Sequence, residues 1–154
     1  MEYLKSFVRN PVFLAAVTSW FLAQLIKTIV ALLRSRKQSF KDTLETLLWR
    51  SGGMPSSHSA LASSLAMSIG FSEGFDSNLF LITMFLAFVI MRDSLGVRRS
   101  SGVQGRVLNT LGRSVSEKLK IDFHPVKEVY GHEPLEVVIG ALLGMLISAA
   151  FFYL

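Results

Sequence analysis

The chain has 154 residues, of which 51% are hydrophobic, and its mean hydropathy is +0.45. This length suits one domain, and the apolar content exceeds that of most water-soluble domains, so residues 1–154 are predicted to form a single membrane-embedded domain. Cysteine is absent, which excludes a disulfide framework and a cysteine-ligated metal site. The formal net charge is +5, but the basic residues lie between apolar runs rather than in one tail. Anionic headgroups or a phosphorylated substrate are therefore favoured as partners over nucleic acid.

Four apolar segments are predicted to cross the membrane as helices, near residues 11–33, 55–72, 77–95 and 133–154. Roughly 20 residues of helix cross a hydrocarbon core of about 30 Å. The second segment is rich in Ala and Ser, and small residues allow membrane helices to approach closely. The connections 34–50 and 100–127 are basic and polar, and one or two interfacial helices are expected there. The predicted fold is all-α, an integral membrane helical bundle.

Lysine and arginine counts in the connections predict the orientation. Residues 34–50 hold five, residues 92–127 hold eight, the N-terminal arm holds two, and the turn between the second and third segments holds none. The two rich connections lie on the same side, which the positive-inside rule makes cytoplasmic. We therefore expect an integral protein of the plasma (inner) membrane.

In this topology the unusual polar residues of the apolar segments gather at the cytoplasmic face. Ionisable side chains at membrane depth are costly, so they are candidates for function. They stand near the ends of all four segments: Lys27, His58, Asp93, Arg98, Arg99, His132 and Glu136.

The second segment begins with a pattern that binds anions. Pro55 suits the first turn of a helix, where a missing amide hydrogen costs nothing. Ser56, Ser57 and His58 would then offer backbone N–H groups at the positive end of the helix dipole. Gly53, just before them, is interpreted as a turn residue, with phosphate contact as the second interpretation.

Pro134 repeats this design at the fourth segment. It places His132 at the helix start, with Glu136 four residues on and near the same face. A carboxylate there can hold an imidazole in one tautomer and raise its basicity, as a nucleophilic histidine requires.

The cations Lys27, Arg98 and Arg99 can neutralise a phosphoryl group during its transfer, with Asp93 as a supporting residue. Two histidines combined with such a clamp indicate phosphoryl transfer through a phosphohistidine.

Three motifs in the chain resemble the divergent branch of the type-2 phosphatidic acid phosphatase family, which is related to acid phosphatases and vanadium-dependent haloperoxidases. The resemblance covers about residues 24–144 and implies a helical membrane phosphatase that uses neither a metal nor another cofactor. The motifs are Gly-Gly-Met-Pro-Ser-Ser-His-Ser-Ala at 52–60, Asp93 to Arg99 with Gly102 and Leu108-Asn109, and Gly-His-Glu-Pro-Leu-Glu-Val at 131–137 with Gly140 and Gly144.

Carried over by position, the resemblance makes His132 the nucleophile, Glu136 the group that orients it, and His58 the acid that protonates the leaving oxygen. The family's Pro-Ser-Gly-His motif falls on residues 55–58, with Ser57 in place of glycine. The family's Lys-x6-Arg-Pro motif is absent, and Val126 stands where an arginine is usual. Lys27 and Arg98 or Arg99 are expected to replace those cations.

Three functions remain open at this level. The leading one is a phosphatase that hydrolyses a lipid phosphomonoester or a prenyl (di)phosphate. The second is a lipid phosphatase that uses His132, Glu133, Glu136 and Asp93 as ligands of a divalent metal. The third is a non-catalytic phospholipid-binding membrane protein. The sequence leaves a homo-oligomer open.

The orientation can be tested with single cysteines, because the natural chain has none. Ser77→Cys lies in the turn expected outside, and Ser101→Cys in the connection expected inside. An impermeant thiol reagent applied to intact cells should label position 77 and spare 101, while permeabilised cells should show both. The reverse pattern would mean an inverted topology.

Overall fold

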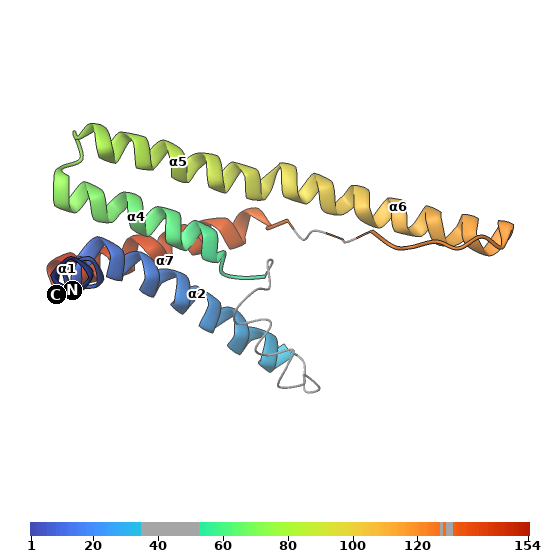
Figure 1. Ribbon diagram of the computed structural model, residues 1–154, viewed down its shortest axis with the longest axis horizontal. Coiled ribbons are helices and arrows are strands. Elements are labelled where there is room, and N and C mark those ends of the chain that lie inside the picture. The colour runs from blue at the N-terminus through green and yellow to red at the C-terminus, as the bar shows by residue number, and fades with distance from the viewer. Residues whose placement is uncertain (35–52, 127, 129–130) are drawn as a thin grey trace.

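The computed structural model describes residues 1–34, 53–126, 128 and 131–154. Within these residues the chain is helical and contains no strand. Figure 1 shows the helices, whose labels are used from here on. They are α1 (Glu2–Arg9), α2 (Pro11–Arg34), α4 (Ser57–Glu73), α5 (Asn78–Leu95), α6 (Val97–Leu119) and α7 (Pro134–Tyr153). The helix expected within 34–50 lies outside the described residues, apart from Arg34 at the end of α2.

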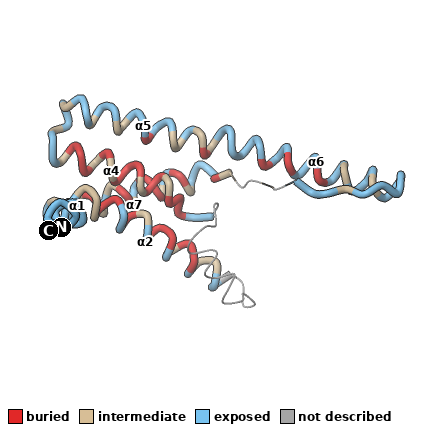
Figure 2. Tube along the Cα trace, viewed as in Figure 1, coloured by how far each residue is buried: buried red, intermediate tan, exposed pale blue. Residues whose placement is uncertain are grey.

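Helix α4 is the centre of the bundle, because α2, α5 and α7 all pack against it. Its buried positions are almost all alanine, serine or glycine, and they bring the neighbouring helices close. Figure 2 shows buried residues along most of α4, whereas α5 is largely exposed.

Buried serines join the helices by hydrogen bonds. Ser63 Oγ of α4 donates to the Ala141 carbonyl of α7 over 2.9 Å. Farther along the same pair of helices, the hydroxyls of Ser68 and Ser148 lie 2.8 Å apart. These bonds satisfy polar groups that have no water to bind inside a bilayer.

Three helices in the described part of the chain are long and apolar enough to cross a membrane: Pro11–Leu33, Asn78–Leu119 and Pro134–Tyr153. The second of these joins α5 and α6, and α5 is its apolar part. Helix α4 has 17 residues, the short end of the spanning range, and runs antiparallel to α5 between the same two ends of the bundle (Figure 1). Large apolar side chains on α5, such as Phe85, Phe88 and Val89, are exposed, which suits contact with lipid. The predicted helical membrane bundle is therefore confirmed.

The starts of the helices differ in one detail from the prediction. Pro134 is in the first turn of α7, as expected, with Glu133 as the N-cap. The expectation that Pro55 lies in the first turn of α4 is wrong, because α4 begins at Ser57. Ser56 is its N-cap, and the Ser56 Oγ accepts a hydrogen bond from the backbone N–H of Ser59.

Helix α6 continues almost in line with α5 and projects beyond the other helices, as Figure 1 shows. It contains the helix expected in the connection 100–127 but begins earlier, at Val97. Residues 121–126 return along it toward the bundle (Figure 1). This return path leads the chain back to the start of α7.

Helix α1 lies at the end of the bundle that also holds the C-terminus, and Figure 1 shows it end-on, across the direction of α2. None of its residues is buried, and Leu4, Phe7 and Val8 share one side of the helix. Phe7 contacts Phe13 of α2 with ring centroids 4.6 Å apart. This orientation suits a helix lying in the membrane interface.

The closeness of α4 and α7 predicts the effect of enlarging Gly144. A Cβ on Gly144 would overlap the Ala60 carbonyl oxygen and Ser63 Oγ, both on α4. Gly144→Val should therefore destabilise the bundle by about 1–3 kcal/mol, the usual cost of overpacking. Thermal unfolding in detergent measures this, with Leu146→Val on the exposed side of α7 as the control. Equal stability of the two variants would contradict this packing.

Candidate functional site

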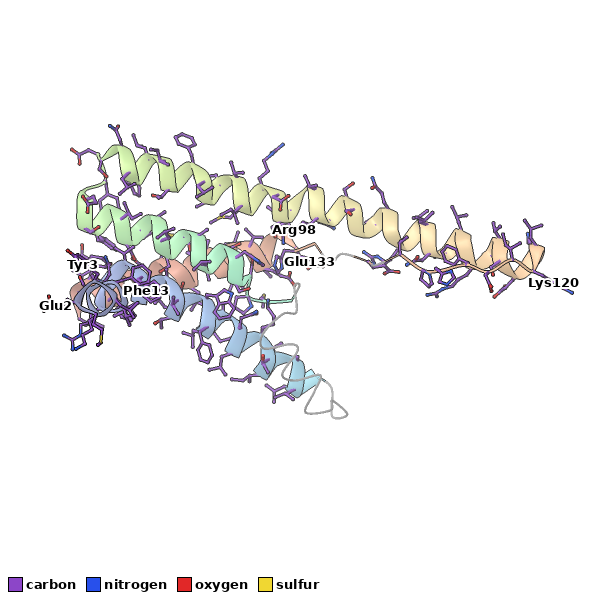
Figure 3. The ribbon with its side chains drawn as sticks, viewed as in Figure 1. Glu2, Tyr3, Phe13, Arg98, Lys120 and Glu133 are labelled. Atoms are coloured by element: carbon purple, nitrogen blue, oxygen red, sulfur yellow. The ribbon has the colours of Figure 1, made fainter. Side chains whose placement is uncertain are left out.

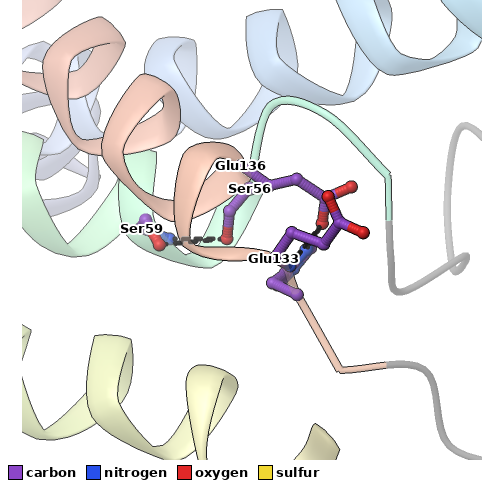
Figure 4. Close-up of polar contacts among 5 residues, drawn as sticks. Ser56, Ser59, Glu133 and Glu136 are labelled. Atoms are coloured by element: carbon purple, nitrogen blue, oxygen red, sulfur yellow. Dashed lines mark hydrogen bonds and ion pairs between the residues drawn. The ribbon is translucent and has the colours of Figure 1, made fainter.

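His132 and Glu136 form a tight pair at the start of α7. His132 is 4% exposed, and its Nδ1 lies 2.7 Å from Glu136 Oε2. The same carboxylate oxygen accepts the backbone N–H of Glu133 over 3.2 Å, a contact visible in Figure 4. An ionised carboxylate can only accept in these bonds, so in the neutral imidazole the proton lies on Nδ1 and Nε2 keeps its lone pair. The ring is thus held in the tautomer that a nucleophile needs.

The backbone of α7 also fixes the start of α4. The Ser56 N–H donates to the Glu136 carbonyl over 2.9 Å. Ser56 Oγ lies 3.0 Å from Ser59 Oγ and also receives the Ser59 N–H (Figure 4). The Ser56 N–H, which was expected to be free to bind an anion, is therefore engaged within the protein. Ser56 lies beside the site as expected, but its N–H is not free.

His58 lies in the first turn of α4 and is half-buried. It interacts electrostatically with Arg98, His132, Lys27 and Asp93. These four residues come from α6, the segment before α7, α2 and α5. The structure therefore brings together residues that the sequence places at the ends of all the apolar segments.

The two arginines after α5 have different surroundings. Arg98 Nε donates to Asp93 Oδ2 over 2.7 Å, and both side chains are partly exposed. Arg98 is the second residue of α6, just after the end of α5, and Figure 3 labels it there. Arg99 instead packs its backbone against Gly131, where an added Cβ would overlap the Arg99 Cα. Arg98 thus interacts electrostatically with His58, and Arg99 supports the chain just before His132.

Lys27 brings a positive charge from α2 to the same end of the bundle. It is 4% exposed, and it interacts electrostatically with His58. Gly53 lies against its aliphatic stem, since a Cβ at Gly53 would be 3.6 Å from Lys27 Cγ. Gly53 has a φ of 89°, a conformation that other residues rarely adopt. Its role as a turn residue beside the site is therefore clear from the backbone. Ser57, also expected to bind phosphate, is buried at the first position of α4.

No sequence pattern assigned a site role to Ser94, which lies near the end of α5. Its carbonyl accepts the backbone N–H of His132 over 3.3 Å, so α5 holds the histidine from the other side. The Ser94 side chain is 4% exposed. Its place beside His132 depends on a contact between residues far apart in the chain, which no local pattern indicates.

Asn109 of α6 holds the segment that leads back to His132. Its side-chain amide donates to the Val126 carbonyl over 3.0 Å and accepts the Val126 N–H over 2.9 Å. It also donates to Glu128 Oε1 over 2.9 Å. Gly112, farther along the same face, lies against the Phe123 ring. Asn109, which belongs to one of the motifs noted in the sequence, therefore guides the chain toward the site.

Among the described residues, no group of three or more His, Cys, Asp or Glu side chains is placed to hold a metal ion. The ligand set suggested by the metal-dependent alternative is therefore not assembled within that part of the chain.

Comparison with known proteins gives a family and one curated relative. Residues 8–147 match the family described as the Divergent PAP2 family. The chain is also similar to an uncharacterized membrane protein, YuiD of Bacillus subtilis (strain 168). The two are 34% identical, and the match covers 99% of this chain and 98% of the relative. No solved structure matches the chain.

The Asn109 contacts predict local protection of the return segment. In Asn109→Ala, the Val126 amide loses its acceptor, so its hydrogen exchange should become faster while exchange in α4 stays unchanged. Thr110→Ala is the control, because that exposed side chain bonds only its own helix, at the Arg106 carbonyl. Hydrogen exchange followed by mass spectrometry compares the two. Equal exchange at Val126 would show that Asn109 does not hold the segment.

Proposed function

Because the chain belongs to the Divergent PAP2 family, we propose that it is a membrane phosphatase that hydrolyses a lipid phosphomonoester or a prenyl (di)phosphate through a phosphohistidine. The observation that carries the proposal is the 2.7 Å contact between His132 Nδ1 and Glu136 Oε2. A buried imidazole that is fixed by a carboxylate on one nitrogen offers the other nitrogen as a nucleophile.

In the first step, His132 Nε2 attacks the phosphorus atom. With a lipid phosphomonoester a P–N bond forms, the P–O bond to the lipid alcohol breaks, and Glu136 stabilises the positive charge that develops on the ring. With a prenyl diphosphate the bond that breaks joins the terminal phosphorus to the bridging oxygen, and prenyl monophosphate leaves. His58, in its protonated form, gives its proton to the leaving alkoxide, so that the lipid departs as a neutral alcohol.

In the second step, His58 is neutral and takes a proton from a water molecule that attacks the phosphohistidine. The P–N bond breaks, inorganic phosphate is released, and His132 and His58 return to their starting forms. One histidine therefore serves as nucleophile throughout, and the other serves as acid and then as base.

Positive charge around the histidines supports this chemistry. Lys27 and Arg98 interact electrostatically with His58 from two different helices. Such fixed cations stabilise the charge on the equatorial oxygens during phosphoryl transfer, most effectively where water is restricted. Arg99, Ser57 and Gly53 line this end of the bundle as further phosphate-binding candidates, and Asp93 holds Arg98 in place.

The position of the site supports a lipid substrate. His58 and His132 lie at the starts of α4 and α7, two helices that are proposed to cross the membrane, so the site would lie near one membrane surface. A phosphorylated lipid can present its phosphate there while its chain stays in the bilayer. The excess of basic residues in the two adjoining connections supports a site that faces the cytoplasm, in the plasma (inner) membrane.

The three histidines provide a test with a built-in control. His132→Ala should abolish turnover of every substrate, because it removes the nucleophile. His58→Ala should slow alkyl phosphates by about 10²–10⁴-fold but slow nitrophenyl phosphate much less, since nitrophenolate leaves without a proton. His124→Ala should behave as wild type, because His124 is exposed in the return segment. Phosphate release from phospholipids, prenyl phosphates and nitrophenyl phosphate measures all three.

Rapid quench with ³²P-labelled substrate should trap an acid-labile, base-stable phosphoenzyme that is absent from His132→Ala. Loss of activity on chelation, together with turnover that proceeds without this adduct, would replace the proposal by metal-activated water. Vanadate binding without hydrolysis of any substrate would instead identify a non-catalytic phospholipid-binding protein.

A further inference from the structure

The hydroxyl of Ser94 is one of two serine hydroxyls among the described residues, the other being that of Ser64, that are buried and have no hydrogen-bond partner. Several other buried hydroxyls in these helices bond a backbone carbonyl, as Ser19 does at Ala16 and Thr28 at Gln24. Ser94 Oγ is buried, yet no hydrogen-bond partner for it lies among the described residues. A buried polar group without a partner is destabilising, so each such group in a native protein calls for an explanation.

Ser94 adjoins the charged cluster through its backbone. Its own carbonyl accepts the His132 N–H over 3.3 Å, which places the residue directly against the proposed nucleophile. The residue before it, Asp93, interacts electrostatically with His58 and pairs with Arg98. The hydroxyl therefore belongs to a residue that is bonded to one histidine and that follows the acidic residue facing the other.

The chemistry of the site identifies the missing partner. A hydroxyl can donate one hydrogen bond, and the cluster around it is rich in cations, so an anionic oxygen is the acceptor that fits. A phosphoryl group has three non-bridging oxygens, and each can accept more than one hydrogen bond, so a neutral donor can bind it together with the cations of this site.

We propose that the Ser94 hydroxyl donates a hydrogen bond to a non-bridging phosphoryl oxygen of the substrate. This inference rests on the proposed phosphatase function. It adds a neutral donor, held beside His132 by the backbone, to the charged groups that bind the phosphate. Ser94 is then a phosphate-binding residue, and its hydroxyl gains its partner only when the substrate is bound.

The chain contains a matched control. Ser64 of α4 is also fully buried, and its Oγ also has no partner among the described residues. It lies six residues beyond His58, about 9 Å along the helix and deeper in the bundle. Ser64→Ala and Ser94→Ala therefore remove the same kind of group, one beside the histidines and one away from them.

The experiment measures orthovanadate binding to the full-length protein in detergent, with thermal unfolding of the ligand-free protein in parallel. Ser94→Ala should weaken vanadate binding about tenfold, as expected for a hydrogen bond to a charged group. Its ligand-free unfolding temperature should not fall, because the hydroxyl has no partner to lose. Ser64→Ala should bind vanadate like wild type. Turnover of a lipid phosphomonoester by Ser94→Ala should fall by about 10²-fold or more, as when one transition-state donor is lost.

The possible failures are distinguishable. If wild type binds vanadate and hydrolyses lipid phosphates while Ser94→Ala matches Ser64→Ala in both assays, the Ser94 inference is wrong and the proposed function stands. If Ser94→Ala lowers the ligand-free unfolding temperature, the hydroxyl has a structural partner and the inference is also wrong. If only lipid turnover falls and vanadate binding does not, Ser94 contacts another part of the lipid. If wild type neither binds vanadate nor hydrolyses any phosphate ester, the proposed function and the inference fail together.

Discussion

The hydrogen bond from the Ser56 N–H to the Glu136 carbonyl is the contact on which the arrangement of the site depends. It joins the start of α4 to the first turn of α7, and each of these starts carries one of the two histidines. The bond is possible because Gly140 lets α7 approach until a Cβ there would overlap the Ser56 carbonyl oxygen. The distance between the two histidines is therefore determined by direct contact between the backbones of α4 and α7, and not by long side chains.

The same constraint explains the composition of α4. Three helices pack against α4. They can approach it closely only because the side chains that α4 buries are small, mainly alanine and serine. The Ser63 and Ser68 hydroxyls bond a backbone carbonyl and another hydroxyl on α7, so these polar groups are satisfied without water. The stability of the bundle and the geometry of the site therefore have one origin, which is the packing of α7 on α4.

Three separate segments hold His132 from different directions. Glu136 fixes its ring, Ser94 accepts its backbone N–H, and Gly131 rests on the Arg99 backbone just before it. The path that delivers the residue runs along α6, where Asn109 binds the returning chain through both its amide and its carbonyl oxygen. A helix that projects outside the bundle thus contributes to the position of a buried histidine inside it. This gives Asn109 and Gly112 a structural role at a distance from the chemistry.

Local patterns in the sequence determined much of this protein. Apolar runs of spanning length predicted the bundle, proline marked the start of α7, and the four-residue spacing of His132 and Glu136 predicted a pair that lies 2.7 Å apart in the structure. These features depend on neighbours within about one helical turn, which the sequence displays directly. Only the tertiary structure decided the rest, because it depends on which segments meet. The Ser56 N–H is engaged by α7, Arg98 rather than Arg99 faces His58, and Ser94 and Asn109 hold the path of His132 through partners that lie 17 or more residues away. Contacts of that kind depend on how the helices pack against one another, so the residue pattern of a single segment cannot predict them.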